Sequence, residues 1–170
     1  KIASIFDKAA GHEWLVAPPE RPFGPVDYGA EFIAQDMSGW DEMVPTIKPC
    51  RYPASGPYLG AALPDHGEVW ALPWDVAAAY DGALTLAVEG RALPYRFARR
   101  MSLDDPAMLH LTYTLANTGD YPIAALWAAH PQFTATPGTR IRLPEHITEL
   151  VNVRLTPEFG AIGLRYRWPQ

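Results

Sequence analysis

The stretch Leu109-His110-Leu111-Thr112-Tyr113-Thr114-Leu115-Ala116, "LHLTYTLA", alternates larger apolar side chains with polar or small ones. Successive side chains of a β-strand point to opposite faces of a sheet, so a period of two predicts a strand with one buried face. Residues 84–88, "LTLAV", alternate in the same way and predict a second strand. These two segments indicate that the chain is built from strands.

The segment that follows the first stretch is Asn117-Thr118-Gly119-Asp120, and its residues are typical of tight turns. We therefore expect a hairpin that leads into a strand over residues 121–129. Residues 139–143, 151–155 and 162–168 are predicted as shorter strands, and residues 144–150 are the one helical candidate. Consecutive strands joined by short turns predict an antiparallel meander.

The composition supports this reading. The 170 residues include 18 prolines and 13 glycines, which favour short strands separated by turns, and 48% hydrophobic residues, which argues against disorder. The length suits one domain. We expect residues 1–170 to form a single β-sandwich domain that is partial, because neither end carries an obvious opening or closing element.

The charge pattern limits the partners. The net charge is −5, and no run of Lys or Arg is longer than two residues, so the chain has no basic patch typical of nucleic-acid binding or of an anionic membrane surface. No apolar run approaches the roughly 20 residues that span a bilayer. The single Cys50 cannot form an internal disulfide, which fits a reducing compartment, and we expect a cytoplasmic protein.

Residues 64–74, "PDHGEVWALPW", gather a histidine, two acids and two tryptophans between prolines. His66 and Glu68 have the spacing that opens the zinc deaminase signature, but the Pro-Cys-x-x-Cys that must follow is missing. A metal site of His66, His110 and His130 is a less favoured alternative, because no two of these residues share a short ligand spacing. Nucleotide-binding loops and the serine nucleophile elbow are also missing from the sequence, and we expect no cofactor.

His130 ends an apolar run directly before Pro131, where regular pairing stops, so it is either a site residue or a histidine that closes a strand. His110 lies opposite the apolar face of its strand and is expected to be exposed.

Sugar sites combine a flat aromatic ring with polar groups for the hydroxyls. Tryptophans near polar residues are therefore candidates for stacking on a sugar, with core packing as the alternative for each: Trp40, Trp70, Trp74 and Trp127.

Four segments in this order resemble the aldose 1-epimerase (galactose mutarotase-like) family: "GWDEMVPTIKP" (39–49), "PDHGEVWALPW" (64–74), "LTYTLANTGDYPIAALWAAHPQF" (111–133) and "PGTRIRLP" (137–144). The resemblance covers nearly all of the chain. Its most specific parts are the His-Gly at 66–67 and the His-Pro-x-Phe at 130–133, which is preceded by a Tyr-x-x-x-Asn pattern at 113–117.

The resemblance implies a large antiparallel β-sandwich whose concave face binds a hexose. It also implies that His66 contacts the sugar near the ring oxygen and anomeric carbon, and that His130 is the general acid on the ring oxygen. The base of the family is a glutamate near its C-terminus, in a region that we expect to lie beyond this chain, so the motif assigns that role to none of Glu145, Glu149 and Glu158.

Anomer exchange needs an acid and a base at one atom pair and no cofactor. The expected partner is a small-molecule sugar. Trp70 or Trp74 is a candidate stacking surface, and we expect Glu68 to be a structural or supporting group. Polar residues expected in loops are candidates for contacts with hydroxyls: Arg51, Asp41 and Asp65. A carbohydrate-binding β-sandwich without turnover is the rival hypothesis.

Overall fold

The computed structural model of the chain describes residues 1–17, 24–105, 108–154 and 156–168. Contacts divide the chain into two compact units, Lys1–Thr134 and Ala135–Gln170. The first unit carries every candidate site residue. That the two units belong to one domain stays a prediction.

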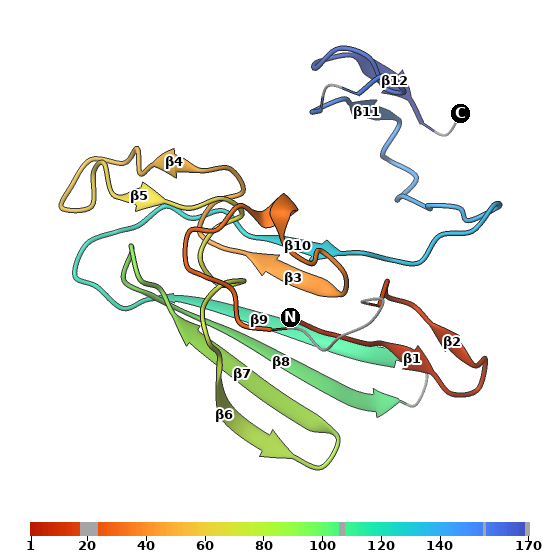
Figure 1. The fold of residues 1–170 in the computed structure, drawn as a ribbon, viewed down its shortest axis with the longest axis horizontal. Helices are drawn as coiled ribbons and strands as arrows, with labels where there is room; N and C mark the ends of the chain where they lie inside the picture. Colours follow the sequence, from red (N-terminus) through yellow and green to blue (C-terminus); the bar gives the residue numbers. More distant parts are fainter. Residues whose placement is uncertain (18–23, 106–107, 155, 169–170) are drawn as a thin grey trace. The chain divides into compact units, whose positions relative to one another are not determined.

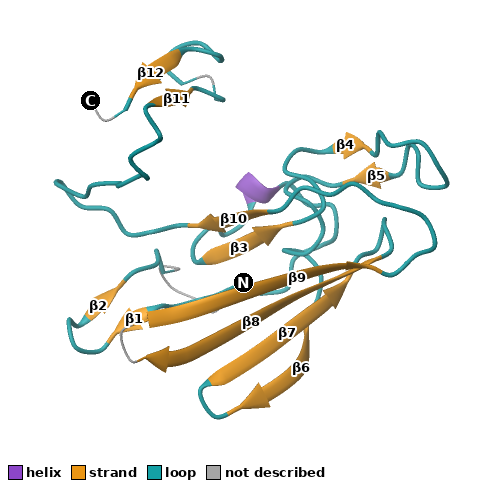
Figure 2. Ribbon diagram, turned by 180° about the vertical axis from the view of Figure 1, so that it is seen from behind, coloured by secondary structure: helices purple, strands orange, loops and turns teal. Residues whose placement is uncertain are grey.

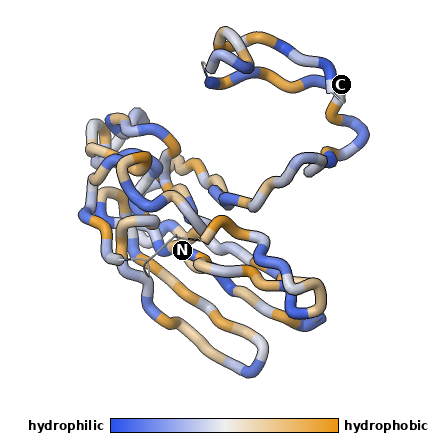
Figure 3. The backbone as a smooth tube through the Cα atoms, turned by 45° about the vertical axis from the view of Figure 1, so that its right-hand side comes forward, coloured by the Kyte–Doolittle hydropathy of each residue, from blue (hydrophilic) through white to orange (hydrophobic). Residues whose placement is uncertain are grey.

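The first unit is built on a four-stranded antiparallel sheet of β6 (Asp75–Tyr80), β7 (Ala83–Glu89), β8 (Tyr95–Asp105) and β9 (Met108–Asn117), which are neighbours in chain order (Figure 1). The all-β class is confirmed, as are the strands over residues 84–88 and 109–115. In Figure 3 apolar and polar residues alternate along the strands of this sheet. In β8 the apolar alternation that begins with the buried Tyr95 and Phe97 is interrupted by Arg99, which takes the next core position before the half-buried Met101.

The predicted hairpin from β9 into residues 121–129 is wrong. The Asn117 side chain accepts a hydrogen bond from the Gly119 amide at 3.0 Å and donates one to the Tyr121 carbonyl at 2.9 Å, and Pro122 has no N–H for a ladder. These contacts turn the chain out of the sheet. The strand that follows, β10 (Ala128–Pro131), pairs instead with β3 (Trp40–Met43).

The β3–β10 pair forms a second layer on the sheet, in a sandwich arrangement (Figure 2). Glu42 of β3 accepts hydrogen bonds from Arg99 of β8 at 3.2 Å and from Tyr113 of β9 at 2.7 Å, so its side chain points toward the sheet. Asp41 directly precedes Glu42 on β3, and His130 lies directly opposite Asp41. Because strand side chains alternate, both point away from the sheet.

Short elements complete the first unit. Strand β1 (Phe6–Asp7) pairs with β2 (His12–Glu13), β4 (Cys50–Arg51) pairs with β5 (Ala62–Leu63), and η1 (Phe32–Ala34) is a short 3₁₀ turn. The buried core contains Val44, Tyr52, Leu63, Val69, Val88, Leu93, Tyr95 and Phe97. In the described part of the chain, no helix has the length and hydropathy needed to cross a lipid bilayer.

The second unit contains one strand pair among its described residues, β11 (Glu149–Val151) with β12 (Arg165–Arg167). The strands predicted over 151–155 and 162–168 are therefore shorter than expected, and residue 155 lies outside the described residues. Asn152 ends β11 because its amide nitrogen donates to the carbonyls of residues 159–161. Residues 139–143 form no strand, and the predicted helix over 144–150 is absent: residues 145–146 form a turn, and Glu149 and Leu150 begin β11.

Candidate functional site

The loop that carries His66 approaches the end of β3 very closely. His66 has a φ of 58° and Gly67 a φ of 74°, so both occupy the left-handed region, which is uncommon for a residue with a side chain. A Cβ atom on Gly67 would lie 2.3 Å from the Val44 carbonyl oxygen. The next residue, Glu68, donates its backbone N–H to that same oxygen at 2.7 Å. Because residue 67 has no side chain, the loop can lie against the end of β3, and this places His66 beside that strand.

The two histidines singled out from the sequence meet in the structure. Their ring centroids lie 5.6 Å apart, with the planes nearly perpendicular. Phe32 of η1 stacks on His66 with a centroid distance of 4.2 Å, and its ring meets His130 edge to face at 5.0 Å. His66 and His130 thus lie on the same side of the β3–β10 layer, with Phe32 between the elements that carry them.

Asp65 braces this aromatic group. Its carboxylate accepts a hydrogen bond from the Phe32 backbone N–H at 3.0 Å, and its carbonyl accepts one from the Trp70 indole N–H at 2.9 Å. Its other carboxylate oxygen lies 2.9 Å from His66 Nδ1, at an angle outside hydrogen-bond geometry, so we treat this contact as electrostatic. Since that nitrogen is closed to solvent, the exposed part of His66 is the rest of its ring.

His130 is half-buried on β10. Its Nδ1 lies 3.3 Å from the Gln132 side-chain nitrogen. Burial lowers the pKa of His130 below its usual value, the nearby His66 lowers the pKa further, and the Asp41 carboxylate acts in the opposite direction. The site therefore favours the neutral imidazole.

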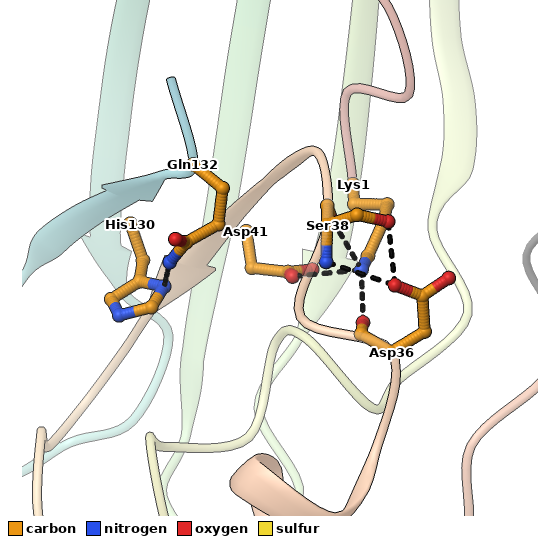
Figure 4. Close-up of polar contacts among 6 residues, drawn as sticks. All are labelled: Lys1, Asp36, Ser38, Asp41, His130 and Gln132. Carbon is orange, nitrogen blue, oxygen red and sulfur yellow. Dashed lines mark hydrogen bonds and ion pairs between the residues drawn. The ribbon is translucent and has the colours of Figure 1, made fainter. Parts of the chain in front are cut away.

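Asp41 lies on a strand, which corrects the prediction that placed it in a loop. Its side chain is 1% exposed, and Oδ2 lies 3.1 Å from Lys1 Nζ (Figure 4). Neither carboxylate oxygen has a partner in hydrogen-bond geometry, and both are closed to solvent. Burial raises the pKa of Asp41, and the charge of Lys1 partly offsets that rise. A direct contact between Asp41 and a sugar hydroxyl would require neighbouring groups to move.

A pocket of about 560 Å³ lies beside Asp41 and Trp70, and its lining also includes Lys1, Gln35 and Asp36. Neither His66 nor His130 is among its lining residues. Sites for small molecules fall in the range of roughly 300–1,000 Å³. The Trp70 ring is held by its bond to Asp65 and meets Phe32 edge to face, with centroids 5.0 Å apart. The pocket therefore offers a fixed aromatic ring together with charged and amide groups.

Two predicted site residues have other surroundings. Trp74 packs in the core, where its indole donates to the Val69 carbonyl at 2.7 Å and its ring meets Phe97 and lies under the Arg99 guanidinium. The core alternative thus describes Trp74. Arg51 is exposed in the β4–β5 hairpin and donates to the Gly60 carbonyl at 3.2 Å.

The structure adds residues that the sequence analysis did not single out. Phe32 contacts both histidines, and its one signal was an aromatic residue in a proline-fenced loop. Gln132 occupies the variable position of the His-Pro-x-Phe motif, so the motif itself gave no reason to choose it. Lys1 had no signal. His110, as expected, is exposed.

Among the described residues, no three His, Cys, Asp or Glu side chains gather in a way that could hold a metal ion. Comparison of the chain with protein-family models, with curated proteins and with solved structures finds no match. A functional hypothesis for this chain therefore rests on its residues and on the geometry of the site.

Proposed function

We propose that the chain is an aldose 1-epimerase-like enzyme that interconverts the α and β anomers of a hexose, with His66 and His130 at the sugar. The observation that carries the proposal is the 5.6 Å separation of the two imidazole rings, which come from positions 64 residues apart. The adjoining pocket and the fixed ring of Trp70 support a sugar as the ligand.

The reaction follows from general acid–base chemistry. In its protonated form His130 donates a proton to the ring oxygen and becomes neutral imidazole, while a base takes the proton of the C1 hydroxyl and the bond between C1 and the ring oxygen breaks. Rotation about the C1–C2 bond of the open-chain aldehyde and ring closure by the reverse steps give the other anomer. His66, held by Asp65, orients the anomeric end.

A non-catalytic carbohydrate-binding module is the second candidate, and one observation favours it. The two carboxylates nearest the histidines are already engaged: Asp41 is closed to solvent beside Lys1, and Asp65 accepts a hydrogen bond from Phe32. A base at the C1 hydroxyl must therefore be another group.

The test is anomer equilibration followed by NMR. A freshly dissolved pure anomer is mixed with wild type, His130→Ala or the exposed control His110→Ala, over a panel of hexoses and hexose phosphates. We expect faster equilibration than in buffer for wild type and the control, and loss of that acceleration in His130→Ala. Sugar binding without acceleration favours the binding module. Equal activity in wild type and His130→Ala overturns the assignment of His130 as the acid. A protein that shows no binding and no acceleration with any sugar overturns both candidates.

A further inference from the structure

The Nδ1 atom of His130 is the side of the ring that Gln132 contacts. The two residues lie two positions apart, and the amide nitrogen of Gln132 is 3.3 Å from Nδ1 (Figure 4). An amide nitrogen donates hydrogen bonds and does not accept them, so in this orientation of the Gln132 amide Nδ1 supplies the lone pair. A neutral imidazole with a lone pair at Nδ1 carries its proton on Nε2.

The second neighbour of His130 is Asp41, which lies directly across the β3–β10 pair. Cβ atoms at such opposed positions are typically about 4.5–5.5 Å apart. Lys1 pairs with the Asp41 carboxylate and also donates to the carbonyls of Asp36 and Ser38, both at 2.8 Å (Figure 4). Because its oxygens are closed to solvent, Asp41 acts on its neighbours through its charge.

We propose that Gln132 and Asp41 are positioning residues for His130: Gln132 selects the tautomer that carries the proton on Nε2, and the Asp41 carboxylate stabilises the protonated ring. The Nε2 edge then presents the proton, while Nδ1 is turned to Gln132. The catalytic use of this arrangement rests on the proposed function, whereas the arrangement itself belongs to the sugar-free protein.

The other groups that face His130 act against Asp41 or are neutral. His66, on the loop 64–70, opposes protonation when it is charged, and Asp65 lies beside His66. Phe32 of η1 is apolar, and Lys1 carries a positive charge beyond Asp41. Burial is the largest cause of the lowered pKa of His130, so Asp41 offsets part of an unfavourable setting.

The tautomer is measured on sugar-free protein by two-dimensional ¹H–¹⁵N NMR of the histidine rings, well above the pH at which His130 is protonated. We expect the Nε2–H form in wild type. In Gln132→Glu the carboxylate can only accept, so the ring should switch to the Nδ1–H form and its titration midpoint should rise. The Nδ1–H form in wild type, or no change in Gln132→Glu, overturns the role of Gln132.

The charge effect is measured by titrating His130 in wild type and Asp41→Asn. We expect a downward shift of the His130 midpoint in Asp41→Asn, with the exposed His110 and His146 unshifted as internal controls. An unshifted His130 overturns the role of Asp41. If Asp41→Asn does not fold, the charge-preserving variant Asp41→Glu is compared with wild type. The difference between the His130 and His110 midpoints should then stay close to its wild-type value. A His130 midpoint that lies further below that of His110 than in wild type would contradict the proposal.

These readouts separate the inference from the proposed function. The predicted tautomer and midpoint shift, found in a protein that accelerates no anomer exchange, would sustain the positioning roles and remove the epimerase. Anomer exchange in a protein whose His130 carries its proton on Nδ1 would sustain the epimerase and remove the positioning role of Gln132.

Discussion

Glu68 and Asp41 are both buried carboxylates, 0% and 1% exposed, and their surroundings differ. The Glu68 carboxylate accepts hydrogen bonds from the hydroxyls of Tyr28 and Tyr95, at 2.6 and 2.9 Å, and from the backbone amides of Arg91 and Ala92, at 3.1 and 2.7 Å. Asp41 has an ion pair with Lys1 and no aligned hydrogen bond. A buried charge whose bonds are all made stabilises the fold, whereas one left poorly bonded points to a role beyond stability.

The largest expected effect is that of Glu68→Ala, which leaves four donors without their acceptor. Burial, together with the Glu68 carboxylate, raises the pKa of both Tyr28 and Tyr95, so their hydroxyls stay protonated donors. Each buried donor left without an acceptor costs about 1–3 kcal/mol, so we expect Glu68→Ala to lose about 3 kcal/mol or more of unfolding free energy. The control is Glu89→Ala, whose exposed pair with Arg96 should contribute less than about 1 kcal/mol. Urea denaturation checks this, and similar losses in the two variants would contradict the structural role of Glu68.

Gly67→Ala tests the backbone between the two regions, because Gly67 joins His66 to Glu68. We expect a loss of roughly 2–4 kcal/mol, from a left-handed φ and from a Cβ placed 2.3 Å from the Val44 oxygen. Gly82→Ala is a matched control, since its φ of +71° is similar and its nearest contact is an ordinary 3.8 Å. That control should lose about 1–2 kcal/mol. Equal midpoints of urea denaturation for the two variants would show that the close approach to β3 costs nothing.

Replacing each carboxylate by its amide sharpens the comparison. In Glu68→Gln an NH₂ group faces donors, so we expect a loss of about 1–3 kcal/mol. Asp41→Asn breaks the ion pair with Lys1, but no aligned hydrogen bond is lost, a costly buried charge is removed and Lys1 keeps its two carbonyl acceptors. The loss should therefore stay below about 1 kcal/mol. Both are measured by urea denaturation at one pH. A loss in Asp41→Asn as large as that in Glu68→Gln would mean that Asp41 is part of the architecture.

The contrast between these carboxylates was only partly readable from the sequence. The expectation that Glu68 is a structural or supporting group agrees with its four hydrogen bonds. Asp41 was a candidate because it was expected to be a polar group in a loop, but it lies on β3, where neighbouring residues point to opposite faces. Glu42, which was not a candidate, bonds the large sheet, and Asp41 faces His130. The register that decides this depends on β10, whose partner no local pattern reveals.

The fold was predictable where period-two patterns were intact, as in β7 and β9. It was not predictable where a charged residue takes a core position, since Arg99 in β8 is buried through its bond to Glu42 on another strand. The expectation that His66 and His130 lie at one site came from the family resemblance. In the structure their ring centroids lie 5.6 Å apart. Phe32 contacts histidines that are distant in the sequence, and Gln132 occupies a variable motif position, so the sequence pattern did not single out either residue.

The smallest expected effect is a pH dependence of stability through His130. Its pKa in the folded chain is below the usual value of about 6.5, mainly because of burial, so between the two values the unfolded chain binds more protons than the folded one. Stability is therefore full above the usual value and falls as the pH falls through this window. Urea midpoints measured between about pH 7.5 and 5.5 should show a drop that His130→Asn reduces and that the exposed control His110→Asn keeps.

The two carboxylates should differ in their effect on this loss of stability at low pH. Because the Asp41 charge favours the protonated ring, its removal in Asp41→Asn should steepen the loss of stability in the same window, whereas Glu68→Gln should leave the slope unchanged. The double variant Asp41→Asn, His130→Asn should lose the extra slope, because the group that titrates is gone. An extra slope that persists in the double variant would mean that it comes from the titration of Asp41 itself, whose pKa burial raises, or from a group other than His130.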